Sequence, residues 1–369
     1  MESTHLVTGA TGFLGSALVL ELLRETSASV VCLARPAGDS SRARERMKRS
    51  LERAATASQQ SHVLDRLQDR WRVVSGDILK PDCGVDEAKV GRVSCVWHVA
   101  ASLRFEPELA PDIFRHNVEG TRNVLALADR IGAERFQYMS TAYVAGAREG
   151  SILEQLMPLD TPVNNAYEGS KVRAEHLVAQ SGLDYRIYRP SIVIGYSKTA
   201  SAAASESGFY GYVRRLARLR RVLQRRGELD KLALATLPGD PEAPLDLIPV
   251  DAVVHNAVSI ARSPSRARIF HLTNASPPQV GAVARTLNRR LRIDGPSFQR
   301  DPSGEGPYAA KLAELMRFFL SYVAGGKTFD RSNTDAAIGA EASLWPLDAD
   351  GVERYVDRFL EELRLAGRA

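Results

Sequence analysis

The fold is decided by the stretch Leu6-Val7-Thr8-Gly9-Ala10-Thr11-Gly12-Phe13-Leu14-Gly15. It reads as a short apolar strand, a turn with three glycines, and the start of a helix whose apolar residues recur at Leu14, Leu18 and Leu22. Such a turn lets a pyrophosphate approach the first N–H groups of a helix, where the helix dipole favours an anion. The spacing is Gly-x-x-Gly-x-x-Gly, not the commoner Gly-x-Gly-x-x-Gly. A tight strand–helix turn without a ligand is the alternative interpretation.

Further strand-like segments at residues 29–34, 73–78, 95–102 and 136–142 each run from apolar residues into a small, polar or charged end. Parallel strands do this when their carboxyl ends face a ligand crevice. We therefore predict an α/β fold with a Rossmann-type doubly wound parallel sheet and a smaller, mostly helical substrate-binding region. At these strand ends, Asp77 is expected to accept a hydrogen bond from an adenine amino group. Ala100 and Ala101 are small enough for a cofactor to lie across them.

The end of the second strand bears on the choice of cofactor. An acidic residue there would bind the ribose 2′-hydroxyl of NAD, whereas an arginine suits the 2′-phosphate of NADP. Arg35 occupies this position, and a predicted helix over residues 40–53 adds further basic residues. Arg35 with Arg44, or with Arg42 instead, is the predicted phosphate site, and the rest are expected to form a solvated face. NADPH is therefore favoured over NADH.

A Tyr-x-x-x-Lys pattern places Tyr167 and Lys171 on one face of a predicted helix. A phenol with a pKa near 10 is a poor acid–base catalyst at neutral pH. An ammonium group one helical turn away favours the phenolate and is expected to lower that pKa. The pair can then exchange a proton with a substrate oxygen. Taken alone, the pattern is more typical of an ordinary amphipathic helix, and only the other motifs of the chain favour catalysis.

Six motifs occur in a fixed order along the first half of the chain. They are Thr-Gly-Ala-Thr-Gly-Phe-Leu-Gly (8–15), His-Val-Ala-Ala (98–101), Asn-Val-Glu-Gly-Thr (117–121), Ser-Thr-Ala-Tyr-Val (140–144), Tyr-x-x-x-Lys (167–171) and Tyr-Arg-Pro-Ser-Ile-Val-Ile-Gly (188–195). Together they resemble an extended short-chain dehydrogenase/reductase. Three further phrases are Cys-Leu-Ala-Arg (32–35), Ser-Thr-Ala-Tyr-Val-Ala-Gly (140–146) and Leu-Ile-Pro-Val-Asp-Ala-Val-Val (247–254). They resemble one branch of that superfamily, the fatty acyl reductases and the thioester reductase domains that release chains from carrier proteins.

The resemblance implies a role for individual positions and no metal site. Thr141 matches the hydroxyl that holds the substrate carbonyl, Tyr167 the general acid, and Lys171 the residue that binds the ribose and tunes Tyr167. Asn117 matches a position near the active site, and residues 190–193 match the loop beside the nicotinamide. The predicted cofactor-binding residues are Thr8, Gly9, Thr11, Gly12, Phe13, Leu14, Gly15, Arg35, Arg44, Asp77, Ile78, Ala100, Ala101, Ser102, Asn117, Tyr167, Lys171, Pro190, Ser191, Ile192 and Val193.

The length of 369 residues fits one large α/β unit with an appended substrate region. We expect the dinucleotide-binding domain over residues 1–195 with return segments at about 247–275, and the substrate-binding region over 196–246 and 276–369. No apolar run approaches the roughly 20 residues of a membrane-spanning helix. A strand so near the N-terminus leaves no room for a signal peptide, so a cytoplasmic protein is expected. The oligomeric state stays open.

The basic character of the chain is concentrated in one predicted helix at residues 209–231. This segment has eight basic and two acidic residues, so its charge exceeds the net +5 of the whole chain. It is either a solvated amphipathic face or a site for a polyanion, such as an acidic carrier protein or the phosphates of coenzyme A. A nucleic acid or a membrane surface is a third alternative. The short length and the lack of interleaved aromatic residues argue against nucleic acid.

Together these features predict an NADPH-dependent reductase. Its expected substrate is an acyl thioester on an acidic carrier protein or coenzyme A, reduced to the aldehyde, with a further step to the alcohol left open. One alternative is an epimerase or dehydratase of nucleotide sugars with tightly held NAD, against which Arg35 argues. Another is a non-catalytic protein that senses the cofactor, against which the intact set of Thr141, Tyr167 and Lys171 argues.

Overall fold

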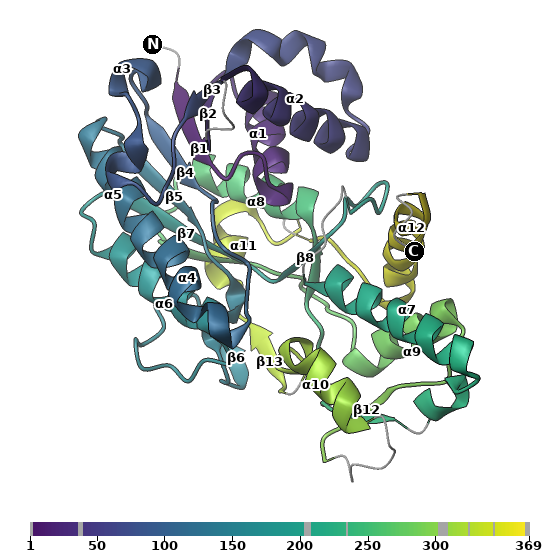
Figure 1. Cartoon of the computed structure of the whole chain (residues 1–369). Coiled ribbons are helices and arrows are strands. Elements are labelled where there is room, and N and C mark those ends of the chain that lie inside the picture. Colours follow the sequence, from purple (N-terminus) through teal and green to yellow (C-terminus); the bar gives the residue numbers. More distant parts are fainter. Residues whose placement is uncertain are drawn as a thin grey trace.

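A seven-stranded sheet forms the centre of the molecule, and every neighbouring pair of its strands is parallel (Figure 1). The strand order reverses direction between β1 and β4, which confirms the predicted doubly wound sheet. In sheet order the strands are β11 (Ile269–Leu272), β7 (Asp184–Pro190), β5 (Arg135–Met139), β4 (Cys95–His98), β1 (Thr4–Thr8), β2 (Ser29–Ala34) and β3 (Trp71–Ser75). The computed structural model describes residues 3–35, 40–202, 208–233, 235–301, 309–323, 325–341 and 344–365.

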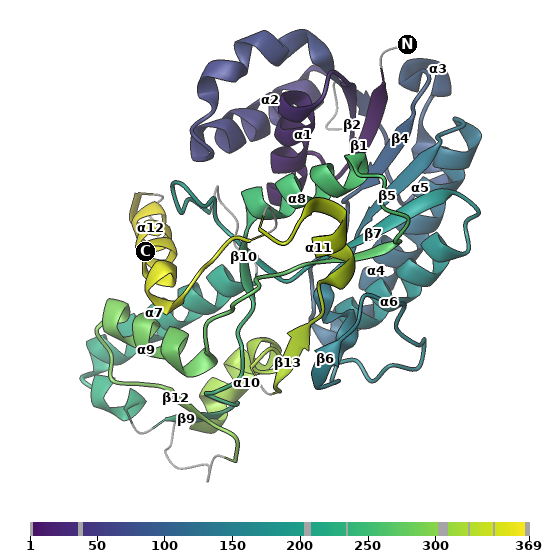
Figure 2. The same cartoon turned by 180° about the vertical axis from the view of Figure 1, so that it is seen from behind.

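Helices cover both faces of the sheet because successive strand residues point to opposite faces. Leu6 packs on one face and Val7 on the other, each in a separate buried apolar cluster. Figures 1 and 2 show the two helical layers. The layer on the Val7 side contains α1 (Phe13–Glu25), α2 (Ser40–Ala57), α8 (Val250–Arg262) and α11 (Ser332–Ile338). The other layer contains α3 (Glu87–Val90), α4 (Ala110–Phe114), α5 (Gly120–Arg130) and α6 (Ala166–Ala179).

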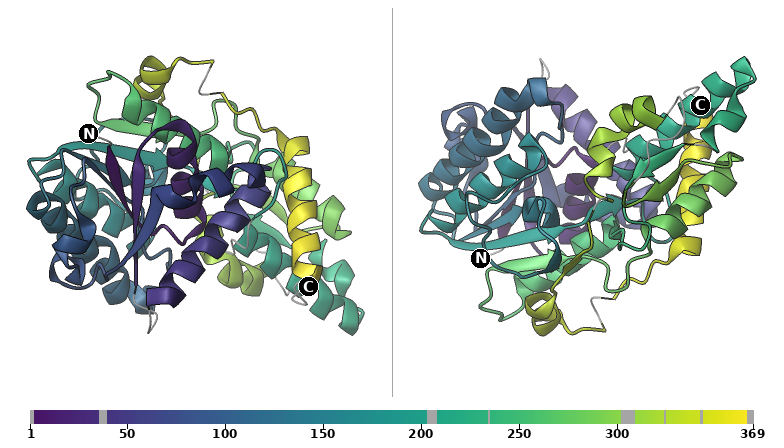
Figure 3. Two further views of the ribbon diagram at one scale, coloured as in Figure 1. Left: turned by 90° about the horizontal axis from the view of Figure 1, so that it is seen from above. Right: turned by 90° about the horizontal axis from the view of Figure 1, so that it is seen from below.

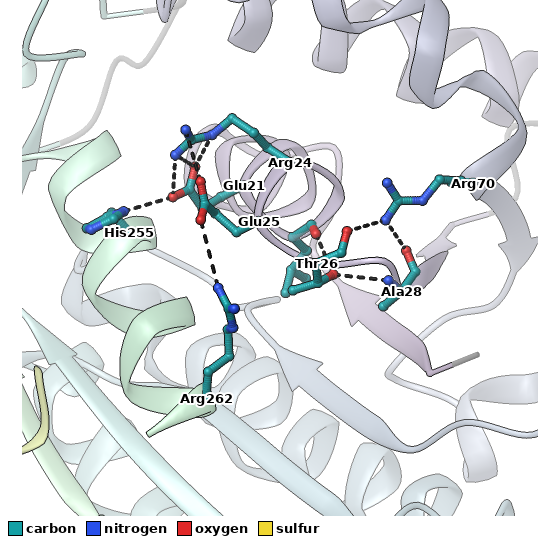
Figure 4. Close-up of polar contacts among 9 residues, drawn as sticks. Glu21, Arg24, Glu25, Thr26, Ala28, Arg70, His255 and Arg262 are labelled. Atoms are coloured by element: carbon teal, nitrogen blue, oxygen red, sulfur yellow. Dashed lines mark hydrogen bonds and ion pairs between the residues drawn. The ribbon is translucent and has the colours of Figure 1, made fainter. Parts of the chain in front are cut away.

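Helix α8 packs with α1 on the main sheet and is held to α1 by two polar contacts (Figure 4). Nδ1 of His255 lies 3.1 Å from a carboxylate oxygen of Glu21, and Arg262 pairs with Glu25 at 3.8 Å. The hydrogen bond with Glu21 raises the pKa of His255, against the effect of burial. The first of these contacts is partly buried, so it holds the returning helix in place.

A second group of helices stands beside the carboxyl ends of the strands and has its own apolar core (Figure 3). The terminal helix α12 packs against α9 and α7 there. The helices are α7 (Phe209–Arg226), α9 (Val280–Leu291), α10 (Ala309–Leu320) and α12 (Ala349–Leu365). Three short parallel pairs join segments far apart in sequence, namely β6 (Gly150–Ile152) with β13 (Lys327–Phe329), β8 (Ile192–Ile194) with β10 (Leu247–Pro249), and β9 (Thr236–Pro238) with β12 (Ser297–Gln299).

The basic helix is shorter than the sequence predicts. Helix α7 ends at Arg226 and not at Lys231, because Gly227 takes a left-handed conformation with φ of 65° and closes the helix. Lys231 lies in a separate short turn, Leu229–Leu232. Among the helices described, none combines the length and the apolar character needed to cross a lipid bilayer.

Candidate active site

One cavity of about 890 Å³ runs from the glycine turn, past the carboxyl ends of the strands, into the second group of helices. Most of the predicted site residues line it. They are Thr8, Gly9, Thr11, Gly12, Phe13, Leu14, Gly15, Arg35, Asp77, Ile78, Ala100, Ala101, Ser102, Thr141, Tyr167, Lys171, Pro190, Ser191, Ile192 and Val193. Two predicted residues, Arg44 and Asn117, do not reach the cavity wall.

The glycine turn has the shape of a cradle for a phosphate group. Gly9 has a φ of +71°, and a Cβ atom on it would lie 2.6 Å from the backbone nitrogen of Ala100. A Cβ atom on Gly15 would lie 2.1 Å from the carbonyl oxygen of Gly9. Gly12, the N-cap of α1, is exposed, and its missing side chain leaves the first N–H groups of α1 open to the cavity. These features fit the pyrophosphate of a dinucleotide.

The second arginine beside Arg35 in the cavity wall is Arg46 and not the predicted Arg44. Arg44 lies over the ring of Trp71, with its guanidinium carbon 5.2 Å from the ring centre. Arg46 instead lines the cavity and donates a hydrogen bond to the carbonyl oxygen of Arg35 at 2.9 Å. The helical pattern held a signal for this, because Arg46 is one turn before Ser50, which donates to the carbonyl of Thr11.

Tyr167 and Thr141 meet at the middle of the cavity. Helix α6 presents Tyr167 in its first turn, which is capped by the side chain of Asn165. Burial raises the pKa of Tyr167 well above its ordinary value, and a hydrogen bond with Thr141 opposes this rise. Thr141 follows β5 and also accepts from the backbone N–H of Tyr143 at 3.2 Å. Tyr167 therefore keeps its proton at neutral pH, in position to donate it.

Lys171 does not lower the pKa of Tyr167 as the sequence predicts. Its ammonium group donates to the carbonyl oxygen of Met139 at 2.8 Å and to the hydroxyl of Tyr138 at 3.2 Å. Burial lowers the pKa of Lys171 to about 7, and the carboxylate of Glu175 opposes this shift. The prediction that Lys171 lowers the pKa of Tyr167 is therefore wrong. Burial dominates the pKa of Tyr167, and the ammonium group of Lys171 contacts Met139 and Tyr138 instead.

Asn117 lies behind the cavity wall. It is buried within a π-helical turn, Arg115–Glu119, between α4 and α5. Its amide oxygen accepts from the backbone N–H of Ser102 at 2.7 Å. Its amide nitrogen donates to the carbonyl of Ser102 at 3.1 Å and to the hydroxyl of Ser170 at 2.9 Å. Asn117 thus ties the end of the fourth strand to helix α6, which carries Tyr167.

A chain of hydrogen bonds through His98 connects Thr8, at the start of the glycine turn, to the π-helical turn that contains Asn117. The hydroxyl oxygen of Thr8 accepts from the N–H groups of residues 99–100, so its proton points to Nδ1 of His98 at 2.7 Å. Nε2 of His98 then donates to Thr121 at 3.0 Å, and Thr121 donates to the carbonyl of Asn117. Burial lowers the pKa of His98 to about 3. His98 is a neutral, fully bonded core residue.

The loop at residues 190–193, which lines the cavity, is held from outside the cavity. Ser191 donates to a carboxylate oxygen of Asp246 at 2.5 Å, and the backbone N–H of Asn274 donates to the same oxygen at 2.9 Å. Burial raises the pKa of Asp246 to about 6. Residues 192–194 continue this loop as β8, which pairs with β10. The motif at residues 188–195 indicated the loop, but its partners come from distant segments.

Several cavity residues have no counterpart among the predictions. Ser140 lies at the end of β5, and its buried hydroxyl has no partner within the described part of the chain. Tyr143 lines the cavity with its ring against Tyr322, 4.3 Å between centres. Another part of the wall comes from the second group of helices and the segments between them, where sequence patterns indicated an apolar core but not which side chains face a cavity. These side chains are Tyr212, Leu245, Val280, Val283, Ala284, Leu287, Phe298, Phe319, Leu320 and Val323.

Comparison with known proteins identifies the family to which the chain belongs. The sequence model of the family described as male sterility protein matches residues 7–257. Isonitrile lipopeptide synthase from Streptomyces coeruleorubidus is 28% identical over 363 residues, which cover 94% of this chain and 22% of that protein. Fatty acyl-CoA reductase 1 from Xenopus laevis is 28% identical over 299 residues, which cover 69% of this chain and 54% of that protein. The chain thus spans about a fifth of the first relative and about half of the second.

Solved structures extend the likeness to nearly the whole chain. The terminal R domain from the myxalamid PKS-NRPS biosynthetic pathway matches with a TM-score of 0.74 at 26% identity, over 98% of this chain and 91% of that one. UDP-glucuronic acid 4-epimerase from Bacillus cereus, in complex with NAD, shares the fold with a TM-score of 0.63 at 19% identity, over 97% of this chain and 96% of that one. The match to the family model includes the glycine turn and the residues Thr141, Tyr167 and Lys171. The chain is a member of the male sterility protein family, in the fatty acyl reductase and carrier-protein thioester reductase branch of the extended short-chain dehydrogenase/reductases.

Proposed function

We propose that the chain reduces an acyl thioester, carried by a carrier protein or coenzyme A, to the aldehyde with NADPH. The observation that carries this proposal is the position of Thr141 and Tyr167. Their hydroxyls meet where the nucleotide part of the cavity opens into an apolar part lined by the second group of helices. A carbonyl group placed there has hydroxyls on one side and hydrocarbon beyond, as an acyl thioester requires.

The residues divide the chemistry between them. The nicotinamide, when bound, supplies the hydride for the thioester carbonyl carbon. Thr141 and Tyr167 hold the carbonyl oxygen and stabilise the negative charge that develops on it. Tyr167 gives its proton to that oxygen. It takes the proton back as the carbon–sulfur bond breaks, so that an aldehyde and a thiolate leave, and the thiolate takes up a proton from water. Lys171, fixed by Met139 and Tyr138, is proposed to bind the ribose.

The preference for NADPH rests on two arginines. Arg35 follows β2 and Arg46 lies beside it, and both line the same end of the cavity. Nε of Arg46 is buried and has no hydrogen-bond partner among the described residues. Two guanidinium groups that have no acidic partner among the described residues suit a 2′-phosphate better than a free hydroxyl.

The proposed partner is an acidic carrier protein or coenzyme A. Helix α7 supports this by placing Tyr212 in the cavity wall and Arg215 over the ring of Phe319, another wall residue, at 5.5 Å. Positive charge therefore stands at the substrate part of the cavity. The likeness to isonitrile lipopeptide synthase and to the terminal R domain of a PKS-NRPS pathway supports a tethered substrate. A sugar nucleotide, the substrate class suggested by the epimerase fold relative, would leave its hydroxyls unpaired against the apolar wall.

The deciding experiment incubates the purified chain with NADPH or NADH and a panel of thioesters, and identifies products by mass. We expect aldehyde from acyl thioesters and faster turnover with NADPH. Tyr167→Phe keeps the ring and removes the proton, so kcat should fall by roughly 10²–10⁴ while cofactor affinity changes little. Copurified NAD with epimerisation of a nucleotide sugar would overturn the proposal. So would near-normal turnover by the Tyr167 variant.

A further inference from the structure

Tyr143 lines the cavity two residues after Thr141, and its hydroxyl has no part in the reaction proposed above. The backbone N–H of Tyr143 donates to the hydroxyl oxygen of Thr141 at 3.2 Å, so both residues belong to the tight turn that follows β5. Tyr143 is buried, and its hydroxyl forms no hydrogen bond with the residues that the structure describes. This hydroxyl is therefore available to a ligand in the cavity.

The ring of Tyr143 is held beside the catalytic tyrosine by aromatic neighbours. It packs edge-on against Tyr322, with 4.3 Å between ring centres, and against Phe329, with 5.8 Å. Burial raises the pKa of Tyr322 well above its ordinary value, and the charges of Glu168, Tyr167 and Tyr143 add to this rise, so the three phenols lie close together. Tyr322 follows α10, in the second group of helices. Tyr143 thus lies near Tyr167 on the substrate side of the cavity.

Tyr143 keeps its proton at neutral pH. Burial raises its pKa well above the ordinary value near 10, and the nearby carboxylates of Asp246 and Glu168 raise this pKa further. The hydroxyl can therefore donate a hydrogen bond but does not exchange its proton as an acid–base catalyst does. A fixed donor of this kind stabilises an atom that gains negative charge during a reaction.

Two atoms of an acyl thioester gain negative charge during its reduction. In the function proposed above, Thr141 and Tyr167 hold the carbonyl oxygen, and the sulfur has no donor. We propose, on the basis of that function, that the hydroxyl of Tyr143 donates a hydrogen bond to the departing sulfur and is thus a further catalytic residue. The electron pair of the carbon–sulfur bond goes to the sulfur, and the phenol proton stays on Tyr143. The thiolate then takes up its proton from water.

The test compares thioesters that share one acyl group and differ in the thiol, with the full chain and NADPH. Tyr143→Phe keeps the ring in its place and removes only the hydroxyl. For an N-acetylcysteamine thioester, kcat/KM should fall about 10- to 100-fold, the effect of a hydrogen bond to a charged group. For the 4-nitrothiophenol thioester it should change little, because the nitro group already stabilises the thiolate. Equal losses on the two thioesters, or no loss on either, would overturn the inference.

Tyr196→Phe is the matched control. Tyr196 is also a buried tyrosine whose hydroxyl has no partner within the described part of the chain, but it does not line the cavity. The substitution removes the same atoms and should leave kcat/KM for both thioesters unchanged. A loss with Tyr196→Phe that matches the loss with Tyr143→Phe would show a general effect of the lost hydroxyl on the fold, and would overturn the inference.

A spectroscopic measurement separates this inference from the proposed reaction. The visible absorption of free 4-nitrothiophenolate moves to shorter wavelength when its sulfur accepts a hydrogen bond, because the negative charge then stays on the sulfur. Bound to the unmodified chain, this probe should absorb at shorter wavelength than when bound to Tyr143→Phe. If no thioester is reduced but this difference appears, the reaction is wrong and the contact is right. Identical bands overturn the inference. Should Tyr143→Phe fail to fold, a band in the unmodified chain like that in an aprotic solvent overturns it.

Discussion

The two hydroxyls at the end of β5 differ in their surroundings, and this difference assigns them different roles. Thr141 is hydrogen-bonded to Tyr167 and to a backbone N–H. Ser140 is 4% exposed and faces the cavity without a partner in the described part of the chain. A buried hydroxyl without a partner is costly unless a ligand satisfies it. Ser140 is therefore positioned to donate to the substrate or to the cofactor.

Ser140→Ala removes that hydroxyl and nothing else. We expect kcat/KM for a thioester to fall about 3- to 10-fold, the size of one ordinary hydrogen bond. The melting temperature should stay the same or rise, because the chain alone gains nothing from the unpaired group. Steady-state kinetics and thermal unfolding check the two halves. A loss of stability with unchanged kinetics would show that Ser140 serves the fold only.

Local chemistry could be predicted from the sequence where it depends on neighbours along the chain. The apolar strand segment around His98 favours a satisfied core histidine over a catalyst, and the bonds of His98 to Thr8 and Thr121 confirm this. The burial that shifts the pKa of Tyr167 and Lys171 could not be predicted, because it comes from packing between distant segments. The unpaired state of Ser140 has the same origin.

At the scale of elements, helix α2 places Arg44 and Arg46 in different surroundings, although the sequence alone does not distinguish them. Arg46→Ala should raise the dissociation constant of NADPH by about 10- to 100-fold, from the 1.5–3 kcal/mol of a hydrogen bond to a charged group. NADH should change little, since it lacks the 2′-phosphate. Arg44→Ala is the matched control and should leave both nucleotides unchanged, because Arg44 lies over Trp71. Fluorescence titration with both nucleotides checks this. Equal effects of Arg46→Ala on NADPH and NADH would contradict it.

Helix α7 likewise has two basic flanks. Arg215 lies over Phe319 on the cavity side, and exposed Arg218 is its neighbour one turn on. Arg220 and Arg221 instead line a separate hollow of about 1080 Å³ with residues of α9 and α12. A carrier that delivers its thioester to the cavity should meet the first flank and not the second.

The two flanks can be compared with double variants that each remove two positive charges. Arg215→Gln with Arg218→Gln should raise KM for a carrier-bound thioester, and added salt should raise it for the unmodified chain. Arg220→Gln with Arg221→Gln should have little effect. An N-acetylcysteamine thioester, which has no carrier or phosphate, should be indifferent to both pairs. Steady-state kinetics on the two substrates checks this. If both pairs of substitutions changed KM for the carrier-bound thioester equally, docking on the flank of Arg215 and Arg218 would be refuted.

The pattern of apolar residues predicted which segments along the chain form the main strands and helices, because periodicity is set within each element. It did not predict where α7 ends, although Gly227 carried that signal. Nor did it predict the pairing of β8 with β10 or of β6 with β13. Those pairs join segments far apart in the chain, and nothing local in either segment identifies its partner.

For the whole molecule, Asp246 makes stability depend on pH in an unusual direction. Burial raises the pKa of this carboxyl group from its ordinary value near 4 to about 6. The folded chain therefore holds a proton that the unfolded chain has released between these pH values. The free energy of unfolding should fall as pH rises through this window and stay lower above it. The effect is at most about 3 kcal/mol, at 1.36 kcal/mol per pKa unit.

Asp246→Asn isolates this contribution. The amide keeps a carbonyl oxygen for Ser191 and for the N–H of Asn274, and it does not ionise. Urea unfolding of both chains between pH 4 and pH 8 gives the difference in free energy. We expect the variant to gain on the unmodified chain as pH rises from 4 to 6, and the difference to be constant above 7. Parallel curves would show that Asp246 does not titrate in this range.

The place of β11 has a consequence for how the protein is made. Strand β7 is interior only because β11 pairs with it, and residues 191–268 must leave the ribosome first. Until then the backbone edge of β7 and the ring of Tyr188, which stacks on Phe270 in the finished sheet, are uncovered. A nascent chain ended after Arg262 should aggregate or recruit chaperones, and one that includes β11 and α11 should not. Equal protease resistance of the two would mean that the sheet is complete without its last strand.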